Sequence, residues 1–146
     1  MQTFFTISEL TVSQAATRKG IDNTPTAEVL LRLNDLIDHI LVPVRMHFAK
    51  PVIISSGYRS PKVNKSVGGA ATSQHCFGEA ADFTVHGVAD LEVAEWIKAN
   101  LPFDQLIMEF PPEGWVHCSY SSRHRGEVLT AKRINGKTVY INGLHP

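Results

Sequence analysis

The longest regular pattern in this chain of 146 residues is a series of apolar residues at helical spacing between positions 29 and 48. The series consists of Val29, Leu30, Leu33, Leu36, Ile37, Ile40, Leu41, Val44 and Phe48. This spacing gives one long helix an apolar face, which has to be buried against the rest of a folded domain. We expect Thr24 to cap the start of the helix with Pro25 at its first position, and Pro43 to kink it near its end.

Two other segments before position 80 have a recognisable character. Residues 7–18 predict a short helix, which Lys19 and Gly20 should end, because a cation and a glycine are typical of a helix C-terminus. Residues 58–72 contain many small polar groups and no period, which indicates a long loop. Loops of this length in small domains are usually functional.

The rest of the chain has the patterns of strands and one more helix. The expected elements are strands over 52–56 and 80–85, a helix over 91–100 capped by Asp90, a hairpin of 105–110 with 115–120 around Pro-Pro-Glu-Gly, and a hairpin over 132–142 around Asn135-Gly136. Helices followed by strands predict an α+β fold. We expect a single domain over residues 1–146, with an antiparallel sheet packed against the N-terminal helices.

Charge and cysteine content limit the partners of the protein. Lys and Arg number 14, as do Asp and Glu, so no net field attracts nucleic acid, which argues against it as a partner. The apolar runs are short and residues 1–5 lack the pattern of a signal peptide, so we expect synthesis in the cytoplasm and no membrane insertion. The two cysteines, Cys76 and Cys118, are expected to be free thiols.

A histidine and an aspartate, His75 and Asp82, lie seven residues apart across Gly78, and a second isolated histidine follows at His117. Catalytic zinc typically has three protein ligands and an open position for water. Because side chains alternate along a strand, Asp82 should share one sheet face with Ala80, and His117 should share one with Trp115. Three ligands on one face of neighbouring strands can converge, which predicts a zinc site on the sheet face.

The run Ser-x-His-x-x-Gly-x-Ala-x-Asp at 73–82, followed by Trp-x-His at 115–117, resembles the zinc D-alanyl-D-alanine carboxypeptidase family. That family also includes phage endolysin peptidases and the zinc-site domain of hedgehog proteins. The segment Ser-Gly-Tyr-Arg-Ser-Pro at 56–61, Asn64 and the Gly-Gly pair at 68–69 are also similar, so the resemblance spans about residues 7–120.

The resemblance implies a role for each of five residues. His75, Asp82 and His117 would hold Zn²⁺. Arg59 would contact the peptide carbonyl or carboxylate near the metal, where a fixed cation stabilises developing negative charge. Ser73 would help to hold the carboxylate of the substrate.

The general base departs from the pattern Glu-x-x-His of many relatives, because Gly114 precedes His117 by three residues. Glu109 on the first hairpin strand and Glu113 in the turn can each take the role. We favour Glu109, since a strand holds a side chain more rigidly than the tip of a turn, and we expect it to pair near Val116 or His117.

Several residues have simpler interpretations. We expect His39, His47, His86, His124 and His145 to be ordinary surface or core residues. Trp115 is expected to pack under the site. A cysteine nucleophile beside a histidine is an alternative chemistry, but alternation along the strand turns Cys118 away from the face of His117.

Together these features predict a zinc metallopeptidase, a hydrolase in which a metal-activated water attacks a peptide bond. By resemblance the substrate is the stem peptide of peptidoglycan, cut at a D-Ala-D-Ala bond or within the stem or cross-bridge. We expect a monomer that acts on the bacterial wall after release, as a phage or prophage product. The alternative is a domain that keeps the fold and zinc but only binds the wall or builds a virion.

Overall fold

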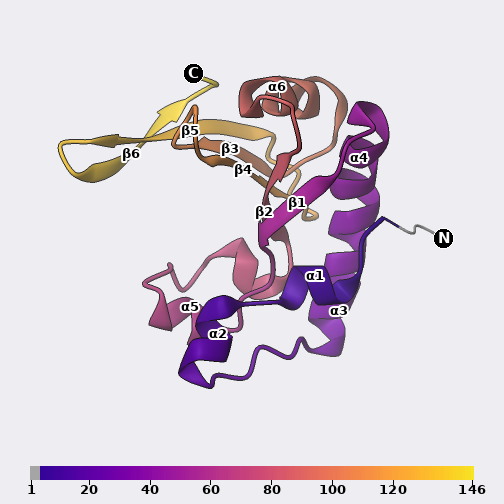
Figure 1. Ribbon diagram of the computed structural model, residues 1–146, viewed down its shortest axis with the longest axis vertical. Coiled ribbons are helices and arrows are strands. Elements are labelled where there is room, and N and C mark those ends of the chain that lie inside the picture. The colour runs from indigo at the N-terminus through magenta and orange to yellow at the C-terminus, as the bar shows by residue number, and fades with distance from the viewer. Residues whose placement is uncertain (1–3) are drawn as a thin grey trace.

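The computed structural model describes residues 4–146, and six strands form one sheet within it (Figure 1). Residues 1–3, on which the expectation of no signal peptide partly depends, lie outside the described residues. The strands are β1 (Val52–Ser56), β2 (Ala80–Val85), β3 (Gln105–Glu109), β4 (Trp115–Ser119), β5 (Glu127–Ile134) and β6 (Lys137–Asn142). Their order across the sheet is β1-β2-β4-β3-β5-β6.

The sheet is mixed, so the prediction of an antiparallel sheet was wrong in one pairing. β3 and β5 are parallel, whereas all the other neighbours are antiparallel. The C-terminal end of β4 lies beside the N-terminal end of β3, and the backbone N–H of Asp104 donates to the carbonyl of Ser119 there. Residues 120–126 then pass the start of β3. β5 therefore begins at the same end of the sheet as β3 and runs in the same direction.

The segment predicted as one helix over 7–18 forms two, α1 (Ile7–Thr11) and α2 (Gln14–Lys19). Ser13 between them has an extended backbone, and its hydroxyl accepts a hydrogen bond from the N–H of Ala16. A serine that caps a new helix in this way interrupts the preceding one. Gly20 ends α2 in the left-handed conformation, as expected.

The long helix consists of α3 (Ala27–Leu36), a π-helical segment η1 (Ile37–Leu41) and α4 (Val42–Phe48). Its N-cap is Thr26, whose hydroxyl accepts from the N–H of Val29, and the prediction of Thr24 was wrong. The Thr24 hydroxyl instead donates to the carboxylate of Asp22. The π segment lies just before Pro43, where the missing N–H of proline already interrupts the helical hydrogen bonds.

Three shorter segments complete the fold. The expected loop over 58–72 contains a helix, α5 (Pro61–Ser66), because Ser60 caps its N-terminus and proline suits its first position. A 3₁₀ turn, η2 (Gln74–Phe77), precedes β2. The N-cap of α6 (Asp90–Asn100) is Ala89 rather than Asp90, and no side chain bonds to that end of the helix.

The hydrophobic core lies between one face of the sheet and the helices α3, η1, α4 and α6. From the sheet it includes Ala81, Phe83, Leu106, Val116 and Cys118. The alternate residues of these strands therefore point away from the helices, toward the opposite face.

In the part of the chain that the structure describes, no helix has the length and apolar character needed to cross a membrane.

Candidate active site

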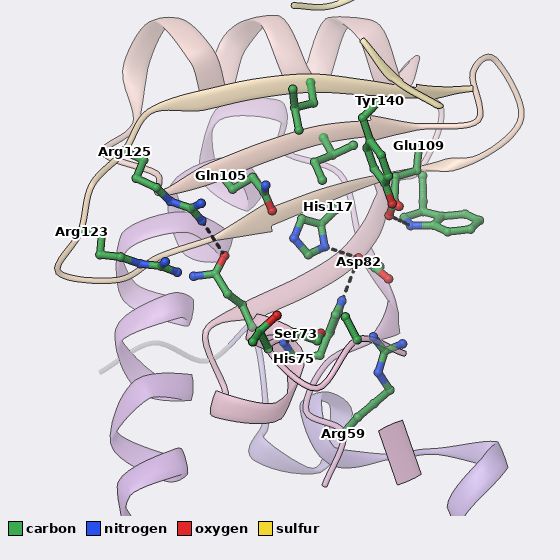
Figure 2. A pocket seen from close by; sticks show the side chains of 16 residues that line it. Arg59, Ser73, His75, Asp82, Gln105, Glu109, His117, Arg123, Arg125 and Tyr140 are labelled. Carbon is green, nitrogen blue, oxygen red and sulfur yellow. Dashed lines mark hydrogen bonds and ion pairs between the residues drawn. The ribbon is translucent and has the colours of Figure 1, made fainter. Parts of the chain in front are cut away.

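A pocket of about 590 Å³ lies on the sheet face opposite the core (Figure 2). Two rows of directly paired residues cross the strands, and all of them except Ala131 line the pocket. The first row is Asp82, His117, Ile107 and Leu129, and the second is Trp115, Glu109, Ala131 and Tyr140. The segment between α5 and β2 forms another wall, with Ala70, Thr72 and Ser73.

The three predicted metal ligands lie together in this pocket. Asp82 and His117 are paired across β2 and β4, and Asp82 Oδ1 lies 2.9 Å from His117 Nδ1 and 3.3 Å from His75 Nε2. One ligand atom of each residue lies within 4.8 Å of the others. The three residues are buried, at 3%, 7% and 8% exposure for His75, Asp82 and His117. This geometry can hold a metal ion.

The His75 ring is oriented by a backbone group of a distant segment. His75 Nδ1 donates to the carbonyl oxygen of Gly57, at 2.7 Å, and Nε2 is the ring nitrogen that faces Asp82. Such a hydrogen bond to the second nitrogen fixes the tautomer of metal-binding histidines. Gly57 follows β1, and the next residue, Tyr58, donates its N–H to the carbonyl of Leu10. The end of β1 therefore determines the direction of the first ligand.

Within the part of the chain that the structure describes, the ionisable groups that pair with Asp82 are the imidazoles of His75 and His117. Burial raises the pKa of this carboxyl, but hydrogen bonds from His117 and His75 outweigh burial, and the pKa lies well below its ordinary value. Among the described residues, no lysine or arginine pairs with Asp82. Two imidazoles and one ionised carboxylate that face a common point are a donor set suited to zinc, so these residues fit the predicted cofactor.

The backbone at Gly78 leaves no room for a side chain. It has φ +76°, and a Cβ there would lie 2.9 Å from the carbonyl oxygen of Val29. The constraint is therefore the close approach of the η2–β2 connection to α3.

Glu109 lies in the same pocket, in the row next to His117. It pairs with Trp115, rather than with Val116 or His117 as expected, and Trp115 Nε1 donates to Glu109 Oε2 at 2.6 Å. Burial and then the charge of Asp82 raise the pKa of Glu109, and His117 and the Trp115 hydrogen bond partly offset this. Trp115 thus orients a carboxylate, in addition to the packing role that was predicted.

Glu113 is exposed in the turn between β3 and β4 and does not line the pocket. Gly114 of this turn has no room for a side chain, because a Cβ would overlap the carbonyl oxygen of Glu109. A turn this tight keeps Glu113 apart from the ligands, and the geometry favours Glu109 as the base.

Arg59 and Ser73 lie on the loop side of the pocket. The Arg59 Nε is buried and has no hydrogen-bond partner among the described residues, and its backbone N–H donates to the carbonyl of His75. A buried guanidinium nitrogen without a partner is costly unless a ligand satisfies it. The hydroxyl of Ser73 accepts from the N–H of His75 and caps η2.

A buried polar network at the other end of the pocket was not predicted. The side chain of Asp104 is fully buried and accepts hydrogen bonds from Arg125 Nε at 2.9 Å, Gln74 Nε2 at 2.8 Å and the hydroxyl of Ser121 at 2.9 Å. Gln74 directly precedes His75, so the network ties the first ligand to the β4–β5 connection. Its members come from η2, the residue before β3 and the β4–β5 connection, and no spacing in the sequence relates them.

Neither cysteine belongs to the pocket. Cys118 is in the hydrophobic core and Cys76 is buried, and both are free thiols, as predicted. Burial raises the pKa of both thiols, which disfavours a thiolate nucleophile. The five histidines predicted to be ordinary residues are all exposed.

Comparison with known proteins agrees with this geometry. No curated protein gives a significant match. Residues 3–119 match the family described as Peptidase M15, whose members are zinc-dependent, and this segment includes His75, Asp82, His117, Glu109 and Arg59. The match covers well over half of the chain, and the chain therefore belongs to the Peptidase M15 family of zinc peptidases, the D-Ala-D-Ala carboxypeptidase and endolysin type.

Proposed function

We propose that the protein is a zinc metallopeptidase that hydrolyses a peptide bond in the stem peptide of peptidoglycan. The observation that carries this proposal is the buried group of His75, Asp82 and His117, with Glu109 held beside it in one pocket. Membership of the Peptidase M15 family supports a peptide derived from peptidoglycan as the substrate.

The ligands in this proposal are His75 Nε2, Asp82 Oδ1 and His117 Nδ1, the atoms that lie closest together. When bound, zinc supplies an acidic water and polarises the carbonyl of the substrate. The hydrogen bond from His75 to Gly57 and the pairing of Asp82 with His117 hold these atoms in place.

Glu109 takes the proton of the attacking water. Trp115 occupies Glu109 Oε2, so Oε1 is the oxygen left to accept this proton. Because burial raises the pKa of Glu109, the carboxyl can also return the proton to the leaving amine. The amine then departs as the new N-terminus.

Arg59 and Ser73 bind the substrate. The unpaired Arg59 Nε provides a donor for the oxygen of the scissile carbonyl, where negative charge develops. The Ser73 hydroxyl accepts from His75 N–H and still has its own proton to donate to a substrate carboxylate. Either a D-Ala-D-Ala bond or a bond within the stem or cross-bridge suits these contacts. The resemblance to endolysins favours action on the wall after release, as a phage or prophage product.

The test is turnover of purified peptidoglycan. Zinc-loaded protein should release new amino groups, and a chelator should abolish the release. Glu109→Gln should lower the rate about 10²- to 10⁴-fold with one zinc still bound, since general bases contribute factors of this size. Glu113→Gln is the matched control and should retain full activity.

Two results would contradict the proposal. Loss of turnover in Glu113→Gln, but not in Glu109→Gln, would assign the base to the turn. A wild-type protein that binds zinc and peptidoglycan but releases no amino groups would be the non-catalytic wall-binding domain.

A further inference from the structure

The C-terminal hairpin of β5 and β6 lies outside the segment that matches the peptidase family, which ends at residue 119. It nevertheless forms part of the pocket, through Leu129 on β5 and Tyr140 on β6. Figure 2 shows Tyr140 extending from this hairpin toward Glu109 at one end of the pocket.

The strand pairing explains how Tyr140 reaches this place. Tyr140 is opposite Ala131, and Ala131 is opposite Glu109, so the three side chains lie in one row on the same face. Glu109 and Tyr140 are two strands apart, about 10 Å between backbones. The side chain between them is only a methyl group, which leaves room for the tyrosine to lean over Ala131.

The Tyr140 side chain is free to bind a ligand. It is 55% exposed, and its hydroxyl makes no hydrogen bond within the described residues. Burial and then the charge of Glu109 raise the pKa of this phenol, so the group remains a proton donor at neutral pH. The apolar ring and Leu129 form a wall, and the hydroxyl offers a donor at its end.

We infer that this hairpin provides a substrate-binding wall, on which the Tyr140 hydroxyl donates to a backbone carbonyl of the bound peptide and the ring packs against a neighbouring side chain. The inference rests on the proposed peptidase function and adds a specificity-determining residue to it. A peptide that passes the metal ligands would lie over Ile107 and Leu129 and meet Tyr140 beside the base.

The experiment measures binding and turnover separately. The dissociation constant of a synthetic stem pentapeptide that ends in D-Ala-D-Ala is measured by calorimetry on zinc-loaded Glu109→Gln protein, with and without a change at Tyr140. Tyr140→Phe should weaken binding about fivefold through loss of one hydrogen bond. Tyr140→Ala, which also removes the ring, should weaken it about tenfold or more. In the active protein, the same changes should raise KM more than they lower kcat.

Val139→Ala is the matched control, because alternate residues of β6 leave the sheet on opposite faces. It should leave the dissociation constant and the turnover unchanged. Equal binding by Glu109→Gln with and without Tyr140→Ala would overturn the inference, as would absence of pentapeptide binding. Weaker binding in Tyr140→Ala together with an inactive wild-type protein would support the wall and reject the peptidase function.

Discussion

The properties of Glu109 depend on one hydrogen bond from a neighbouring strand. Trp115 Nε1 donates to Glu109 Oε2, and this bond favours the ionised carboxylate against burial and the charge of Asp82. A general base acts only when ionised, so the pKa of Glu109 sets the acid limb of the pH profile. The indole therefore controls both the direction and the ionisation of the proposed base.

Trp115→Phe should move the acid limb of kcat/KM to higher pH. The substitution keeps an aromatic ring next to Phe110 but removes the donor, and without it the pKa of Glu109 rises further. A bound cation lowers this pKa in both proteins, so the difference between the two profiles is the quantity to compare. The rate at pH 7 should fall about tenfold, as expected for a hydrogen bond to a charged group.

Trp96→Phe makes the same change on α6, where the indole stacks on His47, and should leave the profile unaltered. An unchanged acid limb in Trp115→Phe would show that the hydrogen bond does not tune the base.

Sequence patterns were sufficient to predict that His75, Asp82 and His117 come together, but not the contacts that orient them. His75, Asp82 and His117 belong to a short motif whose spacing carries the chemistry, and the structure brings them together. The bonds from Trp115 to Glu109 and from His75 to Gly57 join residues whose pairing depends on strand register and on a distant backbone. A contact between two residues that are far apart in the sequence leaves no pattern from which it could be predicted.

At the level of elements, the end of β1 connects the N-terminal helices to His75, one of the proposed metal ligands. Gly57 accepts the hydrogen bond of His75, and a Cβ on Gly57 would overlap the carbonyl oxygen of Leu10 near the end of α1. That contact is to backbone, so α1 or the strand end would have to move.

Gly57→Ala should lower both stability and zinc affinity. Overpacking of this kind typically costs about 1–3 kcal/mol, which lowers Tm by several degrees in a chain of this size. Loss of an outer hydrogen bond to a metal ligand typically weakens metal binding about 10- to 100-fold. Thermal unfolding and a competition titration with a zinc chelator measure the two effects.

Gly87→Ala separates these effects. Gly87 has φ +75° with open space around it, so alanine there costs about 1–2 kcal/mol of backbone strain without contact with the site. Equal zinc affinity in Gly57→Ala and Gly87→Ala would show that the end of β1 does not orient His75.

The elements themselves were predictable where the signal is local. The Asn135-Gly136 turn has positive φ at both residues and joins β5 to β6 as expected, because this pair suits a two-residue hairpin. The parallel pairing of β3 with β5 was missed, since no turn residue encodes which strand a later strand joins. The division into two helices was missed because the helical pattern of residues 7–18 continues past Ser13, although Ser13 caps the start of the second helix.

On the scale of the whole molecule, the hydrogen bonds of Asp104 join η2, which contains His75, to the start of β3 and the β4–β5 connection. Arg125 and Arg123 both pair with this one carboxylate, at 2.9 and 3.3 Å. Both guanidinium groups are partly exposed, so the pairs are worth less than fully buried ones. The network lies where the family-matched segment meets the C-terminal hairpin, which the pairing of β5 with β3 also joins to the sheet.

Asp104 should therefore make the stability of the protein depend on acid pH. Burial raises the pKa of this carboxyl, but the hydrogen bonds from Arg125, Ser121 and Gln74 outweigh burial and hold it well below its ordinary value. A lowered pKa in the folded state stabilises the protein fully above the unfolded pKa, about 3.9, and this contribution is lost as the pH falls from there toward the folded pKa. The free energy of unfolding, measured with urea from pH 7 to pH 3, should decline below about pH 4.

Asp104→Asn should remove this part of the pH dependence. It should also lower the free energy of unfolding at pH 7 by about 2 kcal/mol, less than the loss typical of a fully buried pair, because water reaches both arginines. Asp82 has a lowered pKa as well, so the difference between the wild-type protein and Asp104→Asn at each pH isolates the contribution of Asp104. A difference that stays constant from pH 7 to pH 3 would mean that these hydrogen bonds do not lower the pKa of Asp104 in the folded protein. A difference that shrinks only below about pH 4 would establish that Asp104 is ionised in the folded protein and stabilises it through this charge.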